Sequence, residues 1–131
     1  MIFSEEHAAE TYRSLITVSV EGFKTLLLIN GGAVVAILAY LGQSAHGSAL
    51  AAHVAWPLGA FVMGVGFAAL AFVGSYATQF ALYNETVPHF NYKGPKHMVF
   101  VWATFVLVVL SFAAFACGAV SSVRVLSSPL S

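Results

Sequence analysis

The chain has 131 residues, of which 60% are hydrophobic and 8% are charged, whereas about 25% of the residues of an ordinary soluble domain are charged. This composition leaves little room for a soluble catalytic domain or a disordered tail and indicates an integral membrane protein. Five Lys and Arg residues balance five Glu residues, so the formal net charge is zero. Because no basic patch results, the charge pattern also argues against binding to nucleic acid.

The first predicted element is a long helix over residues 5–42. Ser4 is a suitable N-cap, and Glu5 and Glu6 follow where acidic groups meet the positive end of a helix dipole. Residues 5–24 have one apolar and one polar face. At about 1.5 Å per residue, the whole helix is roughly twice as long as the hydrocarbon layer is thick. We therefore expect residues 1–24 to form a cytoplasmic amphipathic extension of a first span over residues 25–42.

The apolar face of this extension predicts self-association. Residues 1–24 carry four Glu, one Arg and one Lys, a net charge of −2, which anionic lipid headgroups would repel. An upright helix would expose its apolar face to water unless it met copies of itself or another partner. The expected oligomer stripe consists of Tyr12, Leu15, Ile16, Val20 and Phe23.

Two further spans are predicted at about residues 57–83 and 97–126. Proline is tolerated in the first turn of a helix, so the second span starts near Pro57, or earlier with a kink. Turn residues between 84 and 96 close it. The expected fold is therefore all-α: a transmembrane domain of three helices over residues 25–126, the long extension before it, and a short tail over 127–131.

The basic residues predict the orientation, because cytoplasmic flanks carry an excess of Lys and Arg. Four of them flank one side of the predicted spans, namely Arg13, Lys24, Lys93 and Lys96. Arg124 alone flanks the other side. We therefore expect a multi-pass protein with its N-terminus in the cytoplasm.

Polar side chains inside the spans predict a buried polar layer. Asn30 and Gln79 each lie about five residues from the inner end of a predicted span and Thr104 lies a similar distance into the third, so all three are expected at one depth. Tyr76 shares a helix face with Gln79 because they are three residues apart. We interpret these four residues as a layer that joins the three helices. Local hydrogen bonds that only make helix packing specific are the alternative interpretation.

Small residues spaced four apart predict close packing of helices, since they let two backbones approach. Two such sets occur, Ala60, Gly64 and Ala68 in the second span and Ala114, Gly118 and Ser122 in the third. The spacing does not separate contacts within one subunit from contacts between subunits. The single cysteine, Cys117, is expected to be another small packing residue, because it has no partner for a disulfide.

No catalytic or metal-binding constellation is predicted. The Glu residues all lie near or beyond the inner surface, so no carboxylate pair is placed within the membrane, and we do not expect an enzyme. The five histidines fall at both ends of the spans, with His46 and His53 on the outer side and His7, His89 and His97 on the inner side. They are therefore interpreted as interfacial residues, and no metal or other cofactor is expected.

The apolar segment over residues 26–41 has the sequence LLLINGGAVVAILAYL, and it is preceded by Ser14-Leu15-Ile16 and the amphipathic helix. It resembles small uncharacterised membrane proteins of bacteria that share a Leu-rich Ile-Asn-Gly-Gly-Ala first span. This resemblance covers about a quarter of the chain. It implies a location in a bacterial inner membrane and implies no particular activity.

Three functions remain open at this point. The first is an oligomeric pore or membrane-perturbing assembly, which the small residues and the apolar stripe favour. The second is a non-catalytic accessory subunit that packs within a larger membrane complex. The third is a haem- or quinone-binding redox subunit, which depends on the histidines and aromatic residues alone. The expected partners are the lipid bilayer and either copies of the chain or a larger membrane complex.

Overall fold

The computed structural model describes residues 2–43, 47–86 and 94–127. These residues form three helices, α1 (Ile2–Gln43), α2 (Gly47–Thr86) and α3 (His97–Ser127), without any strand in the described part. Each helix includes a stretch that is long and apolar enough to cross a membrane. The protein is therefore an all-α, multi-pass membrane protein with three candidate spans, as the composition predicted.

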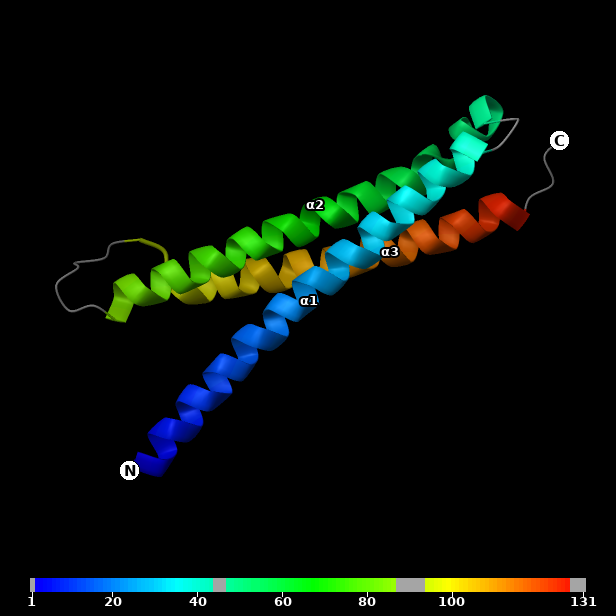
Figure 1. Ribbon diagram of the computed structural model, residues 1–131. Helices are drawn as coiled ribbons and strands as arrows, with labels where there is room; N and C mark the ends of the chain where they lie inside the picture. The colour runs from blue at the N-terminus through cyan, green and yellow to red at the C-terminus, as the bar shows by residue number, and fades with distance from the viewer. Residues whose placement is uncertain (1, 44–46, 87–93, 128–131) are drawn as a thin grey trace.

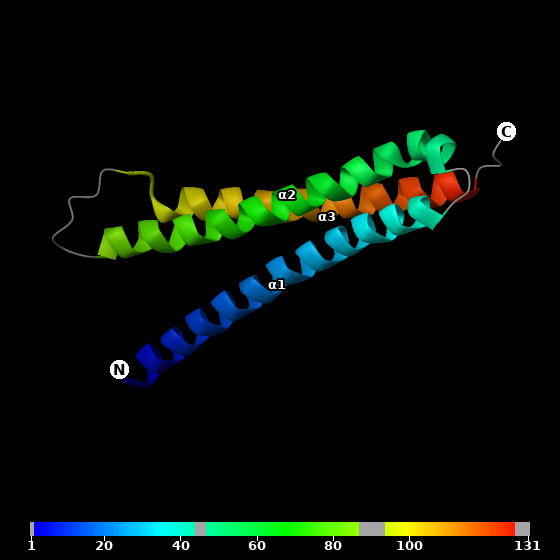
Figure 2. The ribbon, with the colours of Figure 1, turned by 45° about the horizontal axis from the view of Figure 1, so that its top comes forward.

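The helices are arranged as a close pair with a third helix crossing it. α2 and α3 lie side by side along most of their length, and α1 packs mainly on α2 (Figure 1). The second half of α1 follows this pair, whereas its first half leans away from it, so the N-terminus stands apart (Figure 2). The start of α1 and the end of α3 lie at opposite ends of the molecule, as expected for three antiparallel crossings.

α1 is one continuous helix, with no break where residues 24 and 25 were expected to separate an extension from a span. Tyr12 donates a hydrogen bond to Gln79 of α2. The ring of Phe23 meets Phe72 edge to face, with 6.3 Å between the centroids. Residues 12–24 therefore lie beside the apolar part of α2, and the structure does not confirm an extension that stands clear of the spans.

α2 begins ten residues before Pro57, which is buried inside the helix. Of the two predicted starting points, the structure shows the earlier one. The first turns of α2 bend away from the rest of the helix (Figure 2). A bend is expected there because an internal proline removes one backbone hydrogen bond and crowds the preceding turn.

The hydrophobic core is narrow because the helices bury little of their surface against one another. It consists of Phe23, Leu26, Val54, Phe61, Ala68, Ala71 and Ala81. The ring of Phe61 packs against Phe115 with 5.8 Å between centroids and covers Gly118, where an added Cβ would lie 2.9 Å from the ring. Most of the large apolar side chains point outward. This pattern suits a bilayer, in which the solvent is as apolar as the side chains.

Candidate functional site

A polar node lies at the point where all three helices meet. Asn30 of α1 and Ser111 of α3 are both 0% exposed. The Asn30 amide group Nδ2 donates hydrogen bonds to the carbonyl of Leu26 at 3.0 Å and to Ser111 Oγ at 3.4 Å. The Ser111 hydroxyl in turn donates to the carbonyl of Gly64 in α2 at 2.8 Å. A chain of hydrogen bonds therefore connects α1, α3 and α2, and we call these groups the Asn30 node.

Position 64 requires a glycine because the side chain of Asn30 occupies the space that any larger side chain at this position would fill. An added Cβ there would overlap with Asn30 Oδ1, which is buried and accepts no conventional hydrogen bond from the described residues. A similar contact occurs between Gly74 and Thr104 Oγ1, where an added Cβ would lie 2.5 Å from the oxygen. Oxygens held against glycine Cα–H groups recur at helix–helix interfaces. At both positions the two helices therefore approach closely, and the glycine Cα–H group gives the buried oxygen a weak hydrogen-bond partner.

The structure does not bring the predicted polar layer together. Asn30 contacts Gly64, whereas Gln79 lies fifteen residues farther along α2, or about 22 Å away in a helix. The prediction of a single layer is therefore wrong. It counted depth from an assumed span end at residue 24, but α1 continues through that point as one helix, so residue 24 does not mark a level shared with the ends of α2 and α3.

The other members of the predicted layer have separate surroundings. Gln79 accepts the hydrogen bond from Tyr12, and Thr104 packs against Gly74. Tyr76 is 71% exposed and contributes nothing to the interior. Ser111 was missed by the sequence analysis. The signal for it was available, since Ser111 interrupts a long apolar run in the middle of the third span.

A groove of about 1000 Å³ opens between the first half of α1 and the α2–α3 pair. Four of the five residues of the expected oligomer stripe line it, namely Tyr12, Leu15, Ile16 and Phe23. Val20 is half-buried and is not part of the lining. The stripe therefore faces the second and third helices of its own chain. Phe23 is buried, whereas Tyr12, Leu15 and Ile16 remain exposed across the groove, so contact of the stripe with other copies stays a prediction.

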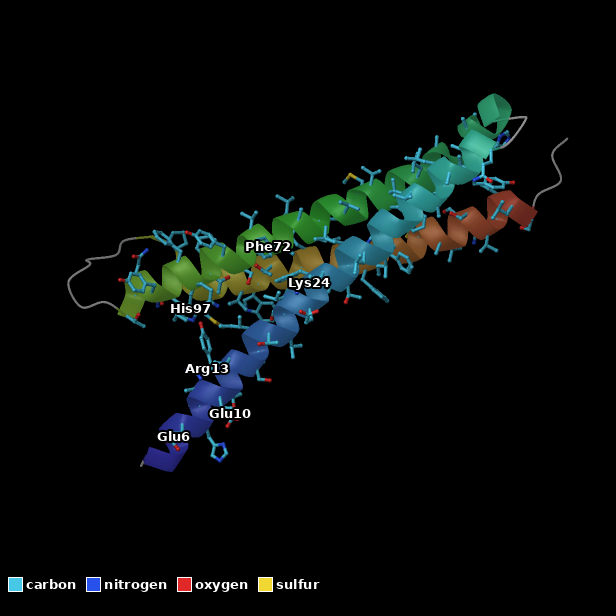
Figure 3. All side chains as sticks on the ribbon, viewed as in Figure 1. Glu6, Glu10, Arg13, Lys24, Phe72 and His97 are labelled. Carbon is cyan, nitrogen blue, oxygen red and sulfur yellow. The ribbon has the colours of Figure 1, made fainter. Side chains whose placement is uncertain are left out.

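The two ends of the groove differ in polarity. Near the meeting point of the helices, its walls are apolar, with Leu26, Ile29, Val109 and Phe112. At its open end the lining includes the Tyr12 phenol, the Gln79 amide and the His97 imidazole. Figure 3 shows His97 at the end of the α2–α3 pair from which α1 diverges. The groove is therefore amphipathic along its length.

Glu85 joins the end of α2 to the start of α3 beside this open end. Its carboxylate accepts a hydrogen bond from the backbone N–H of His97 at 2.7 Å, and its other oxygen lies 2.7 Å from His97 Nδ1. The carboxylate thus accepts a hydrogen bond from one of the backbone N–H groups that have no partner in the first turn of α3, and it lies near the positive end of the dipole of this helix. This contact fixes the relative position of the two helices that form one wall of the groove.

The two predicted sets of small residues lie largely within the chain. In α2, Gly64 and Ala68 are buried and Ala60 is half-buried. In α3, Gly118 is buried and Ala114 and Ser122 are half-buried. The Ser122 hydroxyl donates to the Gly118 carbonyl of its own helix at 2.8 Å. These sets therefore contribute to packing between the helices of one chain.

The part of the chain that the structure describes holds no group of three His, Cys, Asp or Glu side chains placed to bind a metal ion. His46 and His89 lie outside the described residues. Cys117 is exposed. Comparisons with protein families, with curated proteins and with solved structures give no match. The function is therefore argued from the geometry.

Proposed function

We propose that this protein is a non-catalytic membrane protein of the bacterial inner membrane that functions as a homo-oligomer. The observation that carries the proposal is an open face of small residues on α2. Gly59 and Gly66 are exposed, and an added Cβ at either position would have no atom within 4 Å. They are seven residues apart and therefore lie on the same side of the helix. Their neighbours on this side are also exposed, so the Gly59 face consists of Ala55, Gly59, Val62, Gly66 and Ala69.

This face resembles the interfaces that the chain uses internally. Gly64 and Gly118 each receive a side chain from a neighbouring helix, whereas Gly59 and Gly66 receive none from the described residues. In a bilayer no hydrophobic force drives helices together, so association depends on the close packing that small residues allow. A glycine in a helix costs about 1 kcal/mol relative to alanine. A second copy packed on the Gly59 face would offset that cost.

A pore or membrane-perturbing activity would belong to the assembly rather than to one chain. Asn30 and Ser111, the polar groups at the centre of the bundle, are enclosed by the three helices and are 0% exposed. They cannot line a water-filled path within a single chain. The competing role, an accessory subunit of a larger complex, would use the same Gly59 face to contact a foreign chain.

The test is the native mass of the purified chain in a mild detergent, measured by light scattering or native mass spectrometry. We expect a multiple of the 13.8 kDa chain mass, and we expect the Gly59→Leu/Gly66→Leu double variant to be monomeric because two leucines hold the helices apart. Gly32→Leu is the matched control, since Gly32 is also exposed with open space around it. A monomeric natural chain would overturn the proposal, and a co-purifying foreign chain would support the accessory role instead.

A further inference from the structure

We propose that the groove between α1 and the α2–α3 pair binds the ester-linked acyl chain of a membrane glycerolipid. This site is independent of the oligomer interface. Ser75, nine residues beyond Gly66, lines the groove, and nine residues of helix correspond to about half a turn of displacement around the axis. The groove and the Gly59 face therefore lie on opposite sides of α2, and both can be occupied at once.

The groove extends along much of the first half of α1. Its α1 wall runs from Tyr12 to Ile29, seventeen residue steps or about 26 Å of helix. This length is close to the roughly 30 Å thickness of the hydrocarbon layer, so an extended acyl chain can lie along the groove. A helix of a second copy is the competing occupant, and the experiment below distinguishes the two.

The polarity of the lining sets the direction of the lipid. The closed end, near Asn30, is walled by Leu26, Ile29, Val109 and Phe112 and suits the methyl end of an acyl chain. The open end lies beside the end of α2 and the start of α3, where α1 stands farthest from the pair (Figure 1). A lipid bound in this direction would place its glycerol at the open end, beside Tyr12 and Gln79.

Gln79 supplies a hydrogen-bond donor for the ester group. Its Oε1 accepts the hydrogen bond from the Tyr12 hydroxyl, which orients the side chain and directs the Nε2 group elsewhere. This NH₂ group carries two donors, and it forms no hydrogen bond to the residues that the structure describes. The carbonyl oxygen of an ester is an uncharged hydrogen-bond acceptor for these donors. The amide therefore favours an ester-linked chain over a pure hydrocarbon.

The site can be filled without disturbing the fold, and this provides the test. Gly22 lines the groove, and an added Cβ there would have no atom within 4 Å. Gly22→Trp would place an indole in the space of the acyl chain. Gly32→Trp is the matched control because Gly32 lies on the same helix, is exposed outside the groove and also has open space.

The full chain would be purified in detergent with added palmitoyl-oleoyl phosphatidylethanolamine and examined by native mass spectrometry. We expect the natural chain, the Gly32→Trp variant and the Gly59→Leu/Gly66→Leu variant to retain bound lipid, and Gly22→Trp to lose most of it. Gln79→Leu should retain less phospholipid than the natural chain while binding hexadecane equally well. Equal retention by Gly22→Trp and Gly32→Trp, or none by the natural chain, would overturn the proposal. A change of subunit number in Gly22→Trp alone would also overturn it, because a second copy would then occupy the groove.

Discussion

Gly64 and Asn30 show how single residues define this bundle. Asn30 is fully buried, and each of its amide groups lies against another helix or its own backbone. Because lipid offers no hydrogen bonds, an amide in the membrane interior must find its partners in the protein. The absence of a side chain at Gly64 lets the amide reach both the hydroxyl of Ser111 and the surface of α2. The three residues therefore depend on one another.

Gly64→Ala is expected to destabilise the fold because the added methyl group would overlap with Asn30 Oδ1. Overpacking of this kind costs about 1–3 kcal/mol. The measurement is reversible unfolding in detergent. Gly32→Ala is the control, since Gly32 also has open space around it and lies outside the Gly59 face, and it should lose no stability. The Asn30→Ala/Gly64→Ala double variant should recover part of the loss, since the clashing amide is gone. If the two substitutions change the free energy of unfolding additively, Asn30 and Gly64 do not interact, and this result would contradict the Asn30 node.

At the scale of the helices, the sequence allowed the type of element to be predicted but not the partner of each face. Apolar length and the lack of proline before Gly42 identified three helices, and the three-and-four spacing identified the apolar side of α1. Periodicity describes one helix alone. It therefore could not show that Leu15 and Ile16 face the chain's own α2 and α3. Depth counted from assumed span ends failed for the same reason, because α1 crosses the pair at a slant (Figure 2).

The contact between Glu85 and His97 leads to a prediction about how α2 and α3 are joined. Glu85→Ala removes the carboxylate that accepts the first backbone N–H of α3. We expect faster amide hydrogen exchange in residues 97–100, because an uncapped helix end frays. Glu10→Ala is the control, since Glu10 lies on the exposed side of α1. Unchanged exchange at residues 97–100 would show that the carboxylate does not hold this helix end.

At the scale of the whole molecule, the structure refines the charge argument for orientation. Arg13 lies toward the end at which α2 closes and α3 begins (Figure 3). Lys96 directly precedes α3 at this end, while Arg124 lies at the other end, near the close of α3. Lys24 lies eleven residues beyond Arg13 along α1, about 16 Å farther from that end, and forms an ion pair with Glu21 at 2.8 Å. Lys93 is outside the described residues. When Lys24 and Lys93 are left out, Arg13 and Lys96 remain at one end of the bundle and Arg124 at the other. The ratio is smaller than four to one, but the excess is still at the end where α3 begins.

This excess predicts that Gln43, where α1 ends, faces the outside of the cell and that Lys96, just before α3, faces the cytoplasm. The two positions lie at opposite ends of the bundle. Single Gln43→Cys and Lys96→Cys variants would be made in a Cys117→Ser background, because the natural cysteine is exposed. A membrane-impermeant thiol reagent added to intact cells should label the first variant and reach the second only after the cells are opened. The opposite pattern would place the N-terminus outside, and labelling of both in intact cells would mean that the remaining basic residues are too few to impose a single orientation.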